Sequence, residues 1–138
     1  MAIITLTSDW GLSDYYIAAV KGAIYSASPD VTIVDVTHNI ARFDIRSAAF
    51  IIKNCYKNFP DGTIHILAVD TEESVDNPHV ALKMNGHYFI GTDNSIFSLI
   101  IGEEPYEAVI IDVVQDSDFF TFSTRDRFAK VAVMLHNG

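Results

Sequence analysis

The sequence predicts an α/β fold, a Rossmann-like domain of three layers in which a mixed, mostly parallel sheet carries helices on both faces. Short β-branched runs alternate with amphipathic segments in the first half of the chain, and strands connected through helices form right-handed crossovers and a parallel sheet. The dipeptide Asn85-Gly86 then lies between two further apolar runs. Because both residues of a tight hairpin turn must accept positive φ, this pair adds an antiparallel hairpin.

Three strands and two helices are expected in the first half of the chain. The strands are expected at Ile3–Thr7, Thr32–Val36 and Thr63–Asp70. The first helix should cover Asp14–Ala27, where apolar residues recur at helical spacing, and should end before Pro29 because a residue preceding proline leaves the helical region. Apolar positions from Ile45 to Phe59 mark the second helix, which Pro60 ends.

The second half adds more strands and two shorter helices. The strands are expected at Val80–Met84, His87–Ile90 and Glu107–Val113. Asp93 should cap a short helix that Gly102 closes, and Thr124 should cap a last helix that contains Phe128 and Leu135. Both capping residues have side-chain oxygens that accept hydrogen bonds from the first N–H groups of a helix.

Composition narrows the class of protein. The 138 residues fit one domain, and 49% hydrophobic with 20% charged residues excludes intrinsic disorder. A net charge of −9 disfavours nucleic acid and anionic membranes as partners, because both attract Lys and Arg. Cys55 is the only cysteine, so no internal disulfide can form. Without a spanning run or a signal-peptide pattern, a cytoplasmic location is expected.

The candidate site lies where the parallel strands end. Ligands of open α/β sheets bind outside the carboxyl ends of the strands, near the point where strand order reverses. That rule selects the loop of residues 8–14, the Thr37-His38-Asn39 segment and Asp70, and Asp93-Asn94 is expected to join them.

The first of these loops disfavours a phosphate ligand. It has one glycine and two carboxylates, Asp9 and Asp14, whereas a phosphate cradle needs several glycines and exposed N–H groups. Carboxylates suit vicinal hydroxyls, cations or a metal. Trp10 and Phe43 are aromatic residues that either stack on a flat ligand beside such a cleft or simply pack.

Structural roles compete with these functional ones. Asp9 and Asp14 can cap the first helix, which is the commoner role for Asp14. His38 fits a hydrogen-bonded loop histidine, and Cys55 fits inert core. Asp70 is harder to explain structurally, because a carboxylate that ends a buried strand is costly to desolvate.

Six short motifs occur in order along the chain. They are Thr7–Gly11, Val34–Ile40, Phe43–Ala49, Phe59–Thr63, Gly91–Asn94 and Thr121–Asp126. In order and spacing they resemble the S-adenosylmethionine (SAM) hydroxide adenosyltransferases, SAM hydrolases that share their fold with fluorinases and chlorinases. The resemblance covers nearly the whole chain.

The resemblance implies a larger protein and a reaction. Family chains are about twice as long, with an N-terminal α/β domain, a β-rich C-terminal domain and trimers that hold SAM between neighbouring subunits. Residues 1–138 resemble the N-terminal domain alone, so we expect the C-terminal domain to be absent from this chain and a homotrimer where it is present. SAM is the substrate and no cofactor is implied. Water attacks the ribose 5′ carbon and releases methionine, leaving adenosine.

The resemblance also implies roles for individual residues. Asp9 matches the carboxylate that binds the ribose 2′ and 3′ hydroxyls, and Phe43 matches an aromatic residue of the ribose pocket. Asp70 matches the acidic member of the hydrolases' Asp-Arg-His set, which orients or activates water. The expected substrate-binding residues are Asp9, Trp10, Asp14, Phe43, Asn94, Phe122 and Thr124.

The chain departs from the family at two catalytic positions. The expected catalytic set is Asp70, Asn77 and Ser123, in which Asn77 replaces the arginine and Ser123 the histidine, and neither brings a charge. A non-catalytic SAM- or adenosine-binding module is therefore the alternative. A third hypothesis is a Mg²⁺-dependent phosphatase-like site of Asp9, Asp70 and Asp93, since hard cations favour carboxylates. Residues that can compensate for the lost charges are Glu72, Glu73 and His79.

Overall fold

A computed structural model describes residues 2–11, 15–71, 76–111 and 127–137. The strands are β1 (Ile3–Ser8), β2 (Thr32–Thr37), β3 (Ile64–Ala68), β4 (His79–Met84), β5 (His87–Thr92) and β6 (Tyr106–Ile110). The helices are α1 (Tyr16–Ala27), α2 (Ile45–Cys55), the 3₁₀ turn η1 (Tyr56–Asn58), α3 (Ile96–Ile101) and α4 (Ala129–Asn137).

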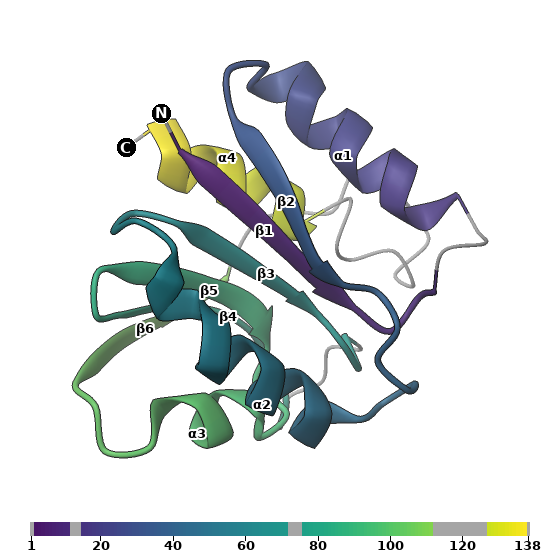
Figure 1. Cartoon of the computed structure of the whole chain (residues 1–138). Coiled ribbons are helices and arrows are strands. Elements are labelled where there is room, and N and C mark those ends of the chain that lie inside the picture. The colour runs from purple at the N-terminus through teal and green to yellow at the C-terminus, as the bar shows by residue number, and fades with distance from the viewer. Residues whose placement is uncertain (1, 12–14, 72–75, 112–126, 138) are drawn as a thin grey trace.

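The strands form one mixed sheet in the order β2-β1-β3-β5-β4-β6. Strand β1 pairs in parallel with β2 on one side and with β3 on the other, and β3 pairs in parallel with β5. Strand β4 is antiparallel to both β5 and β6. Because the chain moves from β1 to β2 and then returns to place β3 on the opposite side of β1, strand order reverses between β1 and β3 (Figure 1).

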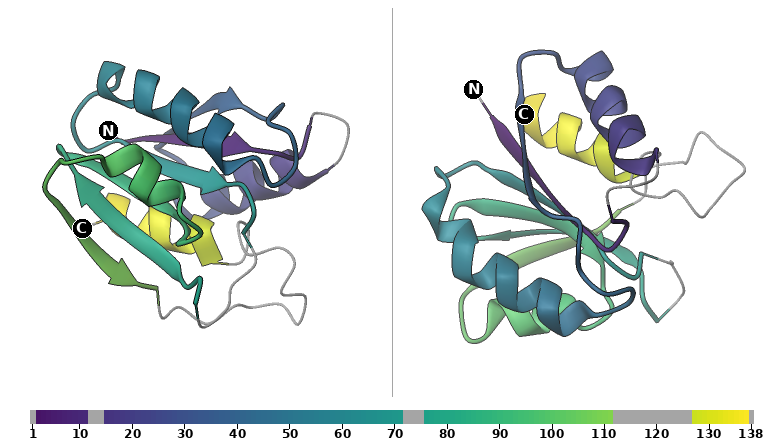
Figure 2. Two further views of the ribbon diagram at one scale, coloured as in Figure 1. Left: turned by 90° about the horizontal axis from the view of Figure 1, so that it is seen from below. Right: turned by 45° about the vertical axis from the view of Figure 1, so that its right-hand side comes forward.

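Helices cover both faces of this sheet, which confirms the three-layer prediction (Figures 1 and 2). On one face, Val20 of α1 and Ala132 of α4 belong to a single buried cluster with Ile66 of β3. On the other face, Ile52 of α2 and Phe97 of α3 belong to a second cluster. All five residues of β3 are buried, because this strand has a helical layer on each side.

The hairpin forms at the predicted turn. Met84 pairs with His87, and Asn85 and Gly86 have φ of 53° and 78°, as a two-residue turn of this hand requires. None of the helices within the described residues is long and apolar enough to cross a membrane.

Several predicted element ends differ from those in the structure, including β5, which ends at Thr92 rather than Ile90, and β6, which ends at Ile110 rather than Val113. Two of the differences have a local explanation. Strand β3 ends at Ala68 rather than at Asp70, because Asp70 has a left-handed backbone with φ of 51° and cannot continue an extended strand. The second helix leaves the α conformation at Cys55 and tightens into η1, as the last turn of a helix often does. Cys55 is half-buried beside the α2–α3 cluster, and burial raises the pKa of its thiol, in keeping with an inert residue.

The predicted N-cap of α3 was also wrong. Asp93 does not cap α3: the N-cap is Ser95, with φ of 82°, and Asn94 Oδ1 accepts the hydrogen bond from the N–H of Ile96 (3.3 Å). Asp93 lies too early in the loop, and its own N–H donates to the carbonyl of Pro78 (2.8 Å). The N-cap of α1 is Tyr15, with no side-chain capping bond, and Asp9, whose carboxylate binds the N–H of Phe43 instead, does not cap that helix. Asp14 and Thr124 lie outside the described residues.

Candidate functional site

The candidate site lies at the carboxyl ends of β1 and β3, where strand order reverses. Ser8 of β1 is in register with Ala68 of β3. Asp9 directly follows β1 and Asp70 comes two residues after β3, so both lie at the same edge of the sheet. Figure 1 shows β1 and β3 as neighbouring strands that run in the same direction. This is the position at which open α/β sheets bind their ligands.

Asp9 is held by a backbone group from a distant loop. Its Oδ2 accepts a hydrogen bond from the N–H of Phe43 (3.1 Å). Phe43 has a left-handed backbone with φ of 63°, its side chain is 62% exposed, and the guanidinium of Arg42 lies 5.3 Å from its ring centroid. A strained residue that shows a large aromatic ring to solvent next to a carboxylate is typical of a binding site.

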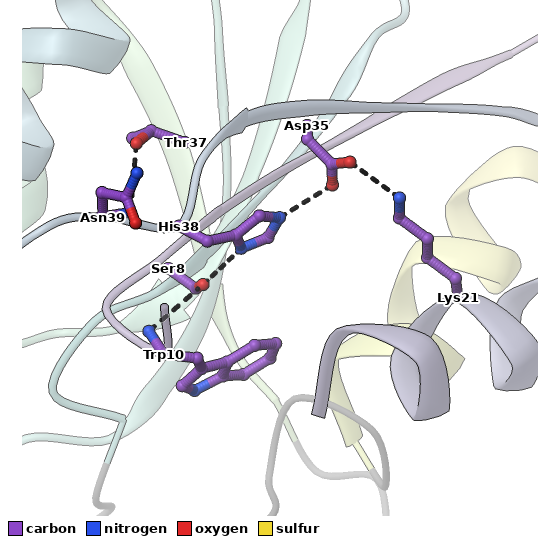
Figure 3. Close-up of polar contacts among 7 residues, drawn as sticks. All are labelled: Ser8, Trp10, Lys21, Asp35, Thr37, His38 and Asn39. Atoms are coloured by element: carbon purple, nitrogen blue, oxygen red, sulfur yellow. Dashed lines mark hydrogen bonds and ion pairs between the residues drawn. The ribbon is translucent and has the colours of Figure 1, made fainter. Parts of the chain in front are cut away.

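The loop that carries Asp9 is anchored to the end of β2 by a chain of hydrogen bonds (Figure 3). Ser8 Oγ lies within hydrogen-bond distance of His38 Nδ1, and His38 Nε2 lies 2.8 Å from Asp35 Oδ1. Lys21 Nζ donates to the other oxygen of Asp35 (2.7 Å). Because a carboxylate only accepts, Nε2 donates to Asp35, and Nδ1 pairs with the Ser8 hydroxyl.

Electrostatics keep this chain in one arrangement. Partial burial alone would raise the pKa of Asp35, but hydrogen bonds from His38 and Lys21 outweigh burial and lower that pKa. Asp35 therefore stays ionised and orients His38, which is only 4% exposed. The hydrogen-bonded role expected for His38 is confirmed, and its side-chain bonds join the end of β1 to β2.

The indole ring of Trp10 stacks on the imidazole ring of His38. Its ring is nearly parallel to the ring of His38, with 6.3 Å between the centroids and 9° between the planes. The backbone turns directly after it, where Gly11 has φ of 74° and donates its N–H to the carbonyl of His38 (2.7 Å). The first loop is thus fixed through Ser8, Trp10 and Gly11, which places Asp9 between anchored neighbours.

Asp70 is positioned through its backbone. Asn94 Nδ2 donates to the carbonyl oxygens of Asp70 (2.8 Å) and Val69 (3.3 Å), while its Oδ1 accepts from Ile96 as part of the start of α3. The structure thus confirms that Asn94 joins this edge of the sheet. Its amide is engaged with the protein backbone rather than displayed outward.

Asn77 and Asp93, two other residues that the sequence pointed to, lie close to each other. Asn77 is exposed, and with its amide nitrogen facing acceptors Nδ2 lies 2.9 Å from the carbonyl oxygen of Asp93. Among the described residues, no three His, Cys, Asp or Glu side chains come together as metal ligands. Asp9, Asp70 and Asp93, all described, therefore do not form the set that the Mg²⁺ hypothesis needs.

Six of the predicted residues lie outside the described residues: Asp14, Glu72, Glu73, Phe122, Ser123 and Thr124. The structure also reveals a residue that the sequence analysis missed: Arg127 Nη1 lies 2.9 Å from Nδ1 of His79. The two residues are 48 positions apart, so no local spacing could have indicated this contact.

Comparisons with known proteins agree with this fold. The model of the SAM hydroxide adenosyltransferase N-terminal domain matches residues 4–138. A protein of Methanocaldococcus jannaschii named (R)-S-adenosyl-L-methionine hydrolase is 28% identical over 144 residues, which cover 99% of this chain and 54% of that protein. A fluorinase of Nocardia brasiliensis is 27% identical over 163 residues, which cover 99% of this chain and 54% of the fluorinase.

A solved structure shows the same architecture. The crystal structure of an uncharacterized conserved protein from Thermotoga maritima superposes with a TM-score of 0.88 at 28% identity, covering 99% of this chain and 54% of that one. The chain thus spans about half the length of the relatives it matches. Since the family model matches almost the entire sequence, the chain belongs to the SAM hydroxide adenosyltransferase family.

Proposed function

We propose that this chain provides the N-terminal half of the site of a SAM hydrolase, which displaces methionine from the ribose 5′ carbon of SAM with water and forms adenosine. The observation that carries this proposal is the pair of carboxylates at the strand reversal, with Asp9 fixed beside the exposed ring of Phe43. A carboxylate suits the vicinal hydroxyls of a ribose, and an aromatic face suits a nucleoside.

The reaction needs little acid catalysis. Water attacks C5′ from the side opposite the sulfonium, the C5′–S bond breaks, and sulfur keeps the electron pair as the thioether of methionine. The water oxygen, now bonded to C5′, becomes the 5′ hydroxyl of adenosine once it has lost one proton. The protein must therefore align water with C5′, exclude other water and accept that proton.

The residues divide into two groups under this proposal. Asp9, Trp10 and Phe43 hold the nucleoside, with Asp14, Phe122 and Thr124 as the further expected members of the binding site. Asn94, which was expected to bind substrate, instead holds the backbone at Asp70. Asp70 orients water and accepts its proton, directly or through solvent. The catalytic positions Asn77 and Ser123 bring no charge, so Asp70 is the residue on which turnover depends most.

The remaining parts of the enzyme are proposed from the family. We propose that a β-rich C-terminal domain and a neighbouring subunit of a homotrimer complete the SAM site, and that the protein acts in the cytoplasm. The high exposure of Phe43 supports the first point, because a nucleoside site needs a cover over such a ring.

The test is adenosine formation from SAM by the purified full-length protein. In isotope-labelled water, label in the 5′ hydroxyl of adenosine and equimolar methionine are expected, and Asp70→Asn should remove most of the turnover while leaving SAM binding. Saturable binding of SAM or adenosine with no product from the unmodified protein would overturn the hydrolase proposal and support the non-catalytic binding module.

A further inference from the structure

The backbone at the end of β3 is held on two sides. Asn94 Nδ2 binds the carbonyls of Val69 and Asp70, and His79 Nε2 lies 2.7 Å from the carbonyl of Thr71. Three successive carbonyls are thus held by side chains from two other segments. Between them Asp70 keeps a left-handed backbone, which disfavours a residue with a Cβ by about 1–2 kcal/mol and persists only where the surroundings fix it.

His79 is held as firmly as the carbonyl it binds. It is the first residue of β4 and is fully buried, and the ring of Phe128 meets it edge-on with 4.8 Å between the centroids. Its Nδ1 lies 2.9 Å from Nη1 of Arg127. Its carbonyl accepts from the N–H of Ile111 (2.8 Å), which ties the start of β4 to the end of β6.

These contacts allow one protonation state of the ring. Nε2 faces a carbonyl oxygen and must carry the hydrogen, whereas Nδ1 faces a guanidinium N–H and must offer its lone pair. Arginine has only donors, so it selects this tautomer and excludes both the other neutral tautomer and the imidazolium. Arg127 and the Thr71 carbonyl therefore select the same tautomer, and Arg127 keeps Nδ1 free of a proton.

The backbone around Arg127 is also irregular. Residues 127–128 form part of a π-helical turn directly before α4. A π turn inside a helix shifts the direction of its side chains and occurs frequently at functional sites. Here it belongs to the segment that brings Arg127 to His79 and Phe128 into the core between α1 and α4.

We propose that Arg127 and His79 are positioning residues for Asp70. Arg127 fixes the tautomer of His79, His79 holds the carbonyl of Thr71, and Asn94 holds the carbonyls of the two peptides that flank Asp70, so that together they set the direction of the Asp70 carboxylate. This inference rests on the proposed function for its catalytic consequence, but the coupling itself is a property of the fold. It also provides a cation and a histidine near Asp70 in a chain that has Asn77 and Ser123 at the family's charged positions.

The first test is independent of turnover. Nitrogen-15 NMR of the imidazole should show His79 as the Nε2–H tautomer, and Arg127→Met, which leaves Nδ1 without its donor, should lower the population of that state and shift the amide signals of Asp70 and Thr71. Arg127→Lys, which keeps a donor, should restore part of both signals. Lys53→Met, which removes a cation from the exposed side of α2, should change neither. A different tautomer in the unmodified protein, or unchanged amides in Arg127→Met, would overturn the proposal.

The second test is kinetic and uses conservative pairs. If Asp70 loses its alignment while Asp9 still binds the nucleoside, kcat should fall about 10- to 100-fold with KM changed less than about 2-fold. We expect that result for Arg127→Met and His79→Leu, and a smaller loss for Arg127→Lys and for His79→Gln, whose amide nitrogen reaches to about the place of Nε2. Equal losses in the conservative and disruptive variants, or an unchanged kcat, would overturn it. If the unmodified protein makes no adenosine, the proposed function fails, and the NMR result alone decides this inference.

Discussion

The carboxylate of Asp9 accepts a hydrogen bond from the backbone N–H of Phe43 across 34 residues of sequence. This contact joins the end of β1 to the loop before α2, and it places an exposed aromatic ring beside a fixed carboxylate. The two loops meet because β1 and β2 are parallel neighbours whose carboxyl ends lie at the same edge of the sheet. In a nucleoside, the hydroxyls of the ribose likewise lie close to the flat ring of the base. The first two predictions rest on this match.

Removing the charge of Asp9 should weaken nucleoside binding. Asp9→Asn replaces a charge-assisted hydrogen bond to a ribose hydroxyl by a neutral one, which we expect to weaken the binding of adenosine by about 1–1.5 kcal/mol, or about 5- to 13-fold in Kd. Titration calorimetry measures this directly. Glu104→Gln, an exposed carboxylate far along the chain, is the charge-matched control, and equal affinities of the two variants would contradict the role of Asp9.

Phe43→Gly should separate stability from binding. Glycine accepts positive φ without a steric penalty, so the free energy of unfolding should stay the same or rise by up to about 1 kcal/mol, while adenosine affinity falls because the ring is gone. Phe50→Gly is the control of opposite sign: Phe50 is equally exposed but lies within α2, where glycine lowers helix stability by about 1 kcal/mol. Urea denaturation compares the two. A marked loss of stability in Phe43→Gly would show that the ring serves packing.

A buried histidine should make stability depend on pH. Burial, with a smaller effect of neighbouring His87, lowers the pKa of His65 from 6.5 to about 3. The unfolded chain therefore binds a proton that the folded protein excludes, so stability is complete above pH 6.5 and falls as the pH decreases toward 3. At pH 5 this single group should lower the free energy of unfolding by about 2 kcal/mol.

Denaturation midpoints between pH 7.5 and pH 4.5 measure that loss, and NMR titration identifies the group. His65 should remain neutral throughout this range, because its ring is fully buried and bonded to Thr5 (2.7 Å) and His87 (3.2 Å). Protonation of His65 in the folded protein near pH 6 would refute the assignment.

The hydrogen bonds of His38 should contribute more to the free energy of unfolding than the ion pair between Lys21 and Asp35. His38→Leu leaves the buried Ser8 hydroxyl without its partner and should lower the free energy of unfolding by about 1–3 kcal/mol. Lys21→Met removes a partly exposed ion pair and should cost less than about 1 kcal/mol. Trp10 is the only tryptophan and stacks on His38, so its fluorescence reports both unfolding and the local change. A larger effect for Lys21→Met would reverse this ranking.

Much of the fold could be predicted from local pattern. The alternation of β-branched and amphipathic runs located the helices and strands, and Asn85-Gly86 located the hairpin, because those signals depend only on neighbouring residues. The ends of β3 and the cap of α3 could not be predicted in this way. Asp70 and Ser95 adopt positive φ, which side chains of their type rarely do, and long-range bonds from Asn94 and His79 surround the first of them.

The residues of the candidate site also fall into those that local pattern predicts and those that it does not. The residue pattern alone predicts that Asp9 and Asp70 lie at the ends of two parallel strands, and that one loop is too acidic and too poor in glycine for phosphate. Three contacts emerge only in the folded chain: Phe43 approaches Asp9, His38 joins Ser8 to Asp35, and Arg127 reaches His79. Periodicity and capping are set within a few residues, whereas these contacts depend on which strands become neighbours and on how closely their connecting loops pack.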